Sequence, residues 1–215
     1  AMVIDTSGRI LAVGGNRLVR YQSDGTLDTS FGSEATGIVT DTRTGDVWDV
    51  SQQADGSYLV TGGAGTFVVT QWSNNGTFTS IHSYAVRPIN SGYHYANSRT
   101  VDSLDDGTII IGGKGYIHSN PDLYFAIVRS EQDRENGVWQ DYLNDFGTNE
   151  WVNASLVLPD GKILLIGRSD TSGQPGLPSA GAVPAITSNA DITISRHHPD
   201  GQLETSFGIM LKFSF

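Results

Sequence analysis

Short apolar segments flanked by polar turn residues recur four times along the chain. Each segment follows a turn that ends in glycine and itself closes on another glycine, as in Ser7–Gly15 and Asp55–Gly63. The same pattern returns at Asp106–Gly113 and at Asp160–Gly167. Apolar runs bounded by turn signals are typical of β-strands, and no long stretch shows the helical period of an amphipathic helix. The pattern predicts an all-β chain.

The spacing of these segments predicts the architecture. Subtracting positions, the turn glycines Gly8, Gly56, Gly107 and Gly161 are 48, 51 and 54 residues apart. That period suits a four-stranded β-propeller blade and is too long for a leucine-rich or ankyrin repeat. We expect a single domain over residues 1–215, a β-propeller built from four four-stranded blade-like repeats at about 1–45, 46–92, 93–148 and 149–215.

A second turn follows each first one and completes the expected four strands. Tyr21–Gly32 is repeated as Trp72–Phe78 and as His198–Gly208, while the third copy is reduced to Asn136-Gly137 and Phe146-Gly147. The third strands are expected at Leu18–Tyr21, Phe67–Trp72, Phe125–Arg129 and Ile192–Arg196. Because Asp-Gly and Asn-Gly favour the positive φ of two-residue hairpins, we expect such hairpins here and assign the turn aspartates a structural role.

One of these segments resembles a known repeat. The run Arg20–Gly32, which includes Asp24-Gly25-Thr26-Leu27-Asp28 and Ser30-Phe31-Gly32, resembles the delta-60 repeat of bacterial proteins. Pro159–Leu164 and Pro199–Gly208 are similar to the same pattern. The resemblance implies a β-propeller within a large, modular surface or secreted bacterial protein, and it supplies no catalytic residues. We therefore expect an extracellular or cell-surface location and a chain that is part of a larger polypeptide.

Composition excludes several classes of function. The formal net charge of -10 would repel nucleic-acid phosphates and anionic membrane surfaces, so we expect no nucleic-acid partner. No apolar run approaches the length of a membrane span, and no signal peptide is recognisable, so any export signal lies elsewhere. With no cysteine, disulfides and thiolate chemistry are absent.

The two ends of the predicted strands differ in chemistry. The Asp-Gly turns at one end leave little room for recognition, whereas loops expected at 114–123 and 168–191 enlarge the other. Counted back from the turn glycines, Trp48, Arg99 and Asn153 share one repeat position at this end. Aromatic rings beside polar groups are typical of sugar- or protein-binding surfaces. The candidate ligand-binding residues are Trp48, Tyr93, His94, Tyr95, Arg99, Tyr116, His118 and Trp151. The alternative is that Trp48 and Trp151 pack between neighbouring blades.

Evidence for catalysis is weak in the sequence. No Gly-x-Ser-x-Gly motif occurs, and the histidines lack zinc spacing; His197 and His198 are consecutive, so they point to opposite faces of a strand. We expect no cofactor, no metal site and no high-affinity calcium site. Carboxylates from separate repeats, such as Asp46 and Glu150, keep a propeller glycosidase or lyase open as an alternative.

We expect a non-enzymatic recognition or adhesion module that binds a cell-surface glycan or protein ligand through the long-loop end. A structural spacer in a large adhesin or fibre is a competing interpretation. Closure of the ring stays open between four blades, completion by a second chain as a homo-oligomer, and missing blades. The last segment, Ile209–Phe215, is a candidate closing strand.

Overall fold

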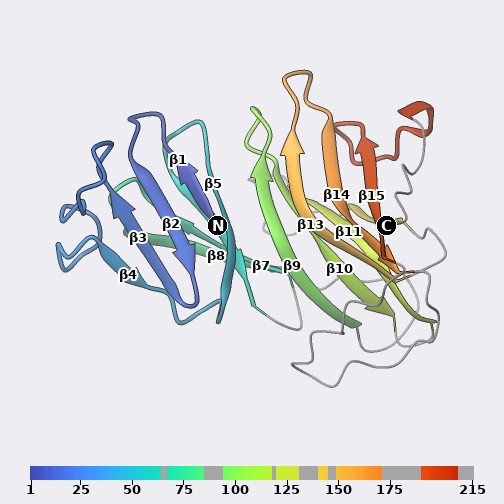
Figure 1. The fold of residues 1–215 in the computed structure, drawn as a ribbon, viewed down its shortest axis with the longest axis horizontal. Helices are drawn as coiled ribbons and strands as arrows, with labels where there is room; N and C mark the ends of the chain where they lie inside the picture. Colours follow the sequence, from blue (N-terminus) through green and yellow to red (C-terminus); the bar gives the residue numbers. More distant parts are fainter. Residues whose placement is uncertain are drawn as a thin grey trace.

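The chain folds into antiparallel β-sheets that follow one another in sequence order (Figure 1). This computed structural model describes residues 1–63, 67–84, 94–117, 120–130, 140–144, 149–170 and 190–207. Within them the secondary structure is β, apart from the 3-10 turn η1 (Thr205–Phe207). The predicted all-β class is confirmed. In the described part of the chain, no helix has the length and apolar character needed to cross a membrane.

Four sheets make up the described structure, each formed by consecutive strands in simple meander order. The first sheet contains β1 (Met2–Ile4), β2 (Ile10–Gly14), β3 (Arg17–Tyr21) and β4 (Ile38–Thr40). The second contains β5 (Val47–Gln52), β6 (Tyr58–Gly62), β7 (Phe67–Trp72) and β8 (Phe78–Tyr84). The third contains β9 (His94–Ser103), β10 (Ile109–Ile117), β11 (Asn120–Ser130) and β12 (Gln140–Asn144). The fourth contains β13 (Asn149–Val157), β14 (Ile163–Asp170) and β15 (Ala190–His197).

The sheets pack in chain order, and a separate apolar core lies at each junction. Leu11, Leu18 and Val60 belong to the core between the first and second sheets. Leu59, Val69 and Ile111 are in the core between the second and third sheets, and Val152 and Leu165 are in the core between the third and fourth. The first strands of successive sheets, β1, β5, β9 and β13, lie against one another. Among the described residues, the fourth sheet does not pack extensively on the first.

The tight turns differ from the predicted two-residue hairpins. The N–H of Gln53 donates to the carbonyl of Ser57, and the N–H of Gly56 donates to the carbonyl of Gln53, which leaves a three-residue loop. Gly56 alone has positive φ in this loop, at 84°. The carboxylate of Asp55 accepts the N–H of Ser57 at 2.8 Å. This is a type I turn closed by a glycine bulge, so the aspartate has the predicted structural role although the loop length was wrong.

The predicted long loops are partly strands. The third strands of the repeats lie where expected, in β3, β7, β11 and β15. However, the expected loop 114–123 is largely a hairpin, because β10 runs to Ile117 and pairs with β11 from Asn120. β14 and β15 likewise take the ends of the expected loop 168–191, whose centre lies outside the described residues. The candidate closing strand Ile209–Phe215 also lies outside them, and the repeat boundaries stay a prediction.

Candidate functional site

A β-bulge interrupts the first strand of three sheets at the same repeat position. In the β5–β6 pair, Val47 lies opposite Gly62 and Asp49 opposite Thr61, so Trp48 is the extra residue. Arg99 in β9 and Asn153 in β13 are the extra residues of equivalent bulges. The structure thus confirms that these three residues share a position. Since a bulge breaks the alternation of side chains, it re-aims each of them relative to its sheet.

The glycine on the facing strand makes room for the bulge. A Cβ atom on Gly62 would collide with the carbonyl oxygen of Asp46, and one on Gly113 would collide with that of Asn97. In the first sheet β1 pairs with β2 only as far as Ala12, and a Cβ on the equivalent Gly14 would meet no atom within 4 Å. The recurring glycine that closes the apolar segment is therefore a steric requirement of the second and third sheets.

Trp48 lies at the junction of the second and third sheets and is partly exposed. The residue is 41% exposed, although Val47 and Val50 of the same strand are buried. The guanidinium carbon of Arg99 lies 4.1 Å from the centre of the Trp48 ring. A guanidinium over an indole face is attracted by the ring quadrupole and holds the ring in place. The pair forms a surface with a flat apolar face and a positive charge.

Trp151 lies at the next junction and is almost covered. It is 8% exposed, and its cross-strand partner Arg168 places its guanidinium carbon 4.2 Å from the ring centre. The ammonium nitrogen of Lys114, from the third sheet, lies 5.8 Å from the same ring. Trp151 therefore packs between sheets, as the alternative interpretation of the sequence expected. The cationic groups of Lys114 and Arg168 therefore both lie beside the Trp151 ring.

These cations are close enough to influence one another. Burial lowers the pKa of Lys114, and the positive charges of Arg99 and Arg168 lower it further. No carboxylate in the described part of the chain forms an ion pair with Lys114 or Arg168. We refer to Trp48, Arg99, Lys114, Trp151 and Arg168 as the tryptophan–cation cluster. It spans three sheets and concentrates positive charge in a chain whose net charge is -10.

Two carboxylates bridge the first strands of neighbouring sheets. Asp49 accepts the backbone N–H of Val101 at 3.1 Å, and Asp102 accepts the hydroxyl of Ser155 at 2.5 Å. Burial raises the pKa of Asp49. Burial also raises the pKa of Asp102 to about 6, with a smaller contribution from the charge of Asp49. Each bridge satisfies a polar group at a sheet junction, so these carboxylates have a structural role.

The other candidate residues lie partly or wholly outside the described residues. Tyr93 and His118 lie outside the described residues. The backbone places His94 opposite Ile117 and Tyr95 opposite Tyr116, at the ends of β9 and β10. Tyr116 was expected in a loop and lies in a strand instead. Trp48, Arg99 and Trp151 are the candidates that the structure brings together.

Lys114 and Arg168 were missed by the sequence analysis. Both directly follow the closing glycine of the second strand, where the first two repeats carry Gly15 and Gly63. A basic residue at this repeat position in the third and fourth repeats was the available signal.

No arrangement of the described residues supports the alternative catalytic and metal-binding interpretations. Asp46 is exposed, and the side chain of Glu150, its proposed partner, lies outside the described residues. Among the side chains that the structure describes, no three histidine, aspartate or glutamate residues gather in a metal-binding arrangement. His197 is fully buried and bonded to Ser195, whereas His198 is exposed, so the two do point to opposite faces.

Comparison with known proteins supports the type of fold. Residues 6–31, which include β2 and β3, match the family described as "Domain of unknown function (DUF5122) beta-propeller". The match supports a β-propeller repeat without being specific for the delta-60 repeat. The chain is also similar to a protein of unknown function from Bacteroides caccae, with 11% identity and a TM-score of 0.42 over 94% of this chain and 78% of that one. No curated protein matches the chain.

Proposed function

We propose that the chain is a non-enzymatic recognition module of a surface or secreted bacterial protein, which binds a carbohydrate carrying acidic groups at the tryptophan–cation cluster. The observation that carries the proposal is the exposed ring of Trp48 beside a row of cations contributed by two further sheets. In this proposal the four sheets are four propeller blades, and the cluster is formed by the first and second strands of the last three.

The chemistry of the cluster suits an acidic sugar. A sugar ring presents C–H groups that pack on a flat aromatic face, and Trp48, 41% exposed, offers such a face. Carboxylate or sulfate groups on the same ligand would accept charge-assisted hydrogen bonds from Lys114 and Arg168, which make no ion pair among the described residues. An acidic group on the ligand would relieve the repulsion between these cations, and this would add to the binding energy that stacking provides. A neutral sugar would lack that contribution.

A matched pair of ligands tests the proposal. Oligogalacturonate and its methyl ester share one backbone and differ in charge, so calorimetric titration of both separates stacking from ion pairing. We expect the acidic form to bind, and Lys114→Gln with Arg168→Gln to weaken its binding about tenfold or more. Trp48→Ala should weaken binding of both forms. Arg17→Gln, which removes an exposed cation of the first sheet, is the control and should bind as the unmodified chain does.

Each outcome decides between interpretations. Binding of the methyl ester alone would exclude the acidic ligand and leave a recognition site for neutral sugars. No binding of any member of a wider glycan array, with every variant folded by circular dichroism, would contradict carbohydrate recognition and favour the structural spacer.

A further inference from the structure

The first sheet has an apolar face on each side. Residues on one side, such as Leu11 and Leu18, are buried against the second sheet. Side chains alternate along a strand, so the neighbouring positions point the other way. That other face is also apolar and at least partly exposed, with Met2 at 69% and Ile4 at 65%. Its apolar members are Met2, Ile4, Ile10, Ala12, Val19, Tyr21 and Ile38, and the register places Arg17 and Thr40 at one end of the same face.

The fourth sheet has the same property at the other end of the stack. Ile163 and Leu165 are buried against the third sheet. The alternate positions form a second apolar face, on which Leu156 is 52% and Ile192 is 40% exposed. Its apolar members are Leu156, Leu164, Ile166, Ile192 and Ile194, and the register places Arg168 and Arg196 on the same face. We call these two surfaces the head face, on the first sheet, and the tail face, on the fourth.

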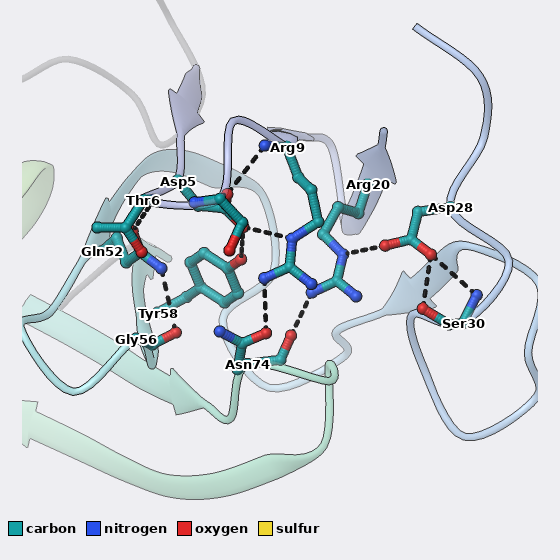
Figure 2. Close-up of polar contacts among 11 residues, drawn as sticks. Asp5, Thr6, Arg9, Arg20, Asp28, Ser30, Gln52, Gly56, Tyr58 and Asn74 are labelled. Carbon is teal, nitrogen blue, oxygen red and sulfur yellow. Dashed lines mark hydrogen bonds and ion pairs between the residues drawn. The ribbon is translucent and has the colours of Figure 1, made fainter. Parts of the chain in front are cut away.

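A clip of three side chains, Arg20, Asp28 and Phe31, seals the junction between the first and second sheets. Arg20 donates from Nε to Asp28 at 2.8 Å (Figure 2). Its guanidinium carbon lies 4.5 Å from the centre of the Phe31 ring. Arg20 also donates from Nη1 to the backbone carbonyl of Asn74, in a turn of the second sheet. Phe31 covers the last residue of that turn, since a Cβ on Gly76 would lie 2.8 Å from its ring. The clip therefore recognises an Asx-Gly turn of the next sheet.

The fourth repeat contains an equivalent clip whose side chains are more exposed to solvent. Arg196 donates to Glu204 at 2.7 and 3.0 Å, and its guanidinium carbon lies 4.1 Å from the Phe207 ring centre. The side chain of Arg196 is 26% exposed, against 2% for Arg20. Phe207 is partly exposed, whereas Phe31 is fully buried. The described residues contain no turn of a following sheet for this clip to cover.

The matching turn is the one left uncovered in the first sheet. Gly25 occupies the position of Gly76, yet it is exposed, and a Cβ there would meet no atom within 4 Å. The equivalent Gly201 of the fourth repeat is buried, as Gly76 is. The turn at Ser23–Gly25 thus lacks the clip that covers the corresponding turn of the second sheet.

We infer that two copies of the chain associate head to tail, with the tail face of each on the head face of the other. In each contact the clip of Arg196 and Phe207 would cover the Ser23–Gly25 turn, as Arg20 and Phe31 cover the turn ending at Gly76. A second copy is the partner because each chain carries both halves of the contact. Within one chain, the described parts of the first and fourth sheets do not pack extensively on each other. Two such contacts close a ring.

Light scattering on the purified chain tests the association. We expect twice the 23.0 kDa mass of one chain at micromolar concentration. Ile4→Asp on the head face should give a single-chain mass and raise the dissociation constant at least about 100-fold, because burying a carboxylate in an apolar contact is costly. Ile81→Asp changes another exposed isoleucine, 46% exposed on the second sheet, and should leave the mass unchanged. Circular dichroism shows that each variant is folded.

Mixing two variants tests the head-to-tail arrangement. Ile4→Asp impairs only the head face and Ile192→Asp only the tail face, so each variant alone should have a single-chain mass. Their mixture retains one intact head and one intact tail and should recover a two-chain species with weaker affinity. A single-chain mass for the unmodified protein, a mass above two chains, or a variant that remains a dimer on its own would each overturn the inference.

Discussion

At the scale of single residues, Asp102 ionises under unusual conditions. Its carboxylate is largely buried at the junction of the third and fourth sheets, where it accepts the hydroxyl of Ser155. Burial and the nearby Asp49 raise its pKa to about 6, above the ordinary value of 3.8. The folded protein therefore binds this proton more tightly than the unfolded chain does. The contribution of Asp102 to stability is complete at acidic pH and is lost as the pH rises through about 6.

Replacing Asp102 with asparagine should remove this dependence. The side-chain amide could still accept the Ser155 hydroxyl, but it would not ionise. Between about pH 4 and pH 7 we expect the free energy of unfolding of Asp102→Asn to gain up to about 3 kcal/mol relative to the unmodified chain. Urea denaturation at a series of pH values measures it. Asp105→Asn, in the adjacent exposed turn, controls for the loss of one negative charge, and an equal gain there would contradict the assignment.

The candidate site could be predicted in part at this scale. The counting of repeat positions correctly placed Trp48 and Arg99 together, since homologous positions in adjacent repeats face the same junction. It did not reveal Lys114 and Arg168. Arg168 meets Trp151 through the register of β13 on β14, and Lys114 reaches it through the packing of the third sheet on the fourth; neither has a sequence pattern. The predicted Tyr93 and His118 remain untested.

At the scale of strands, the bulge in the first strand of the later sheets determines where glycine is required. The sequence showed that each apolar segment closes on glycine, and it gave no reason. The reason is that a backbone carbonyl of the bulged facing strand lies so close to Gly62 and Gly113 that a Cβ atom at either position would collide with it. The turn loops were predicted one residue too short for a related reason. Asp-Gly fits both two- and three-residue loops, and the pairing of Gln53 with Ser57 selects the longer one.

Alanine substitutions at two equivalent glycines test the steric role of the bulge. Gly62→Ala should lower the free energy of unfolding by about 1–3 kcal/mol or more, because its Cβ meets a backbone carbonyl that cannot easily move. Gly14→Ala occupies the same repeat position beside open space and should cost far less. Thermal denaturation of both variants measures the difference. Equal losses of stability in the two variants would show that the conformational flexibility of glycine, rather than the lack of space for a Cβ atom, explains why glycine recurs at this position.

At the scale of the molecule, each sheet packs extensively only on its neighbours in the described structure, so the order of the cores follows the order of the chain. The period of the turn glycines was sufficient to predict that antiparallel sheets follow one another along the chain. It could not predict how the ends are covered. Both end faces are apolar, and closure depends on long-range geometry that a repeat pattern does not contain.

Weakening the central junction should separate the two halves of the chain. Ile111 is fully buried in the core between the second and third sheets, and Ile111→Ala should cost about 2–5 kcal/mol. Because coupling between halves depends on this core, we expect the single unfolding transition to broaden or divide into two. Calorimetry follows the transition. Leu11→Ala, in the first junction, is the comparison, and identical behaviour of the two variants would contradict a special role for the central core.

The sequential pairing of the strands has a consequence for synthesis on the ribosome. Every strand of the first sheet lies within residues 2–40, so each of these strands has its pairing partners before the second sheet emerges. Each later sheet is completed in the same way and can be added to one that already exists. No strand of the described sheets needs to wait for a partner from a distant part of the chain. The nascent polypeptide can therefore fold one repeat at a time, in the order of translation.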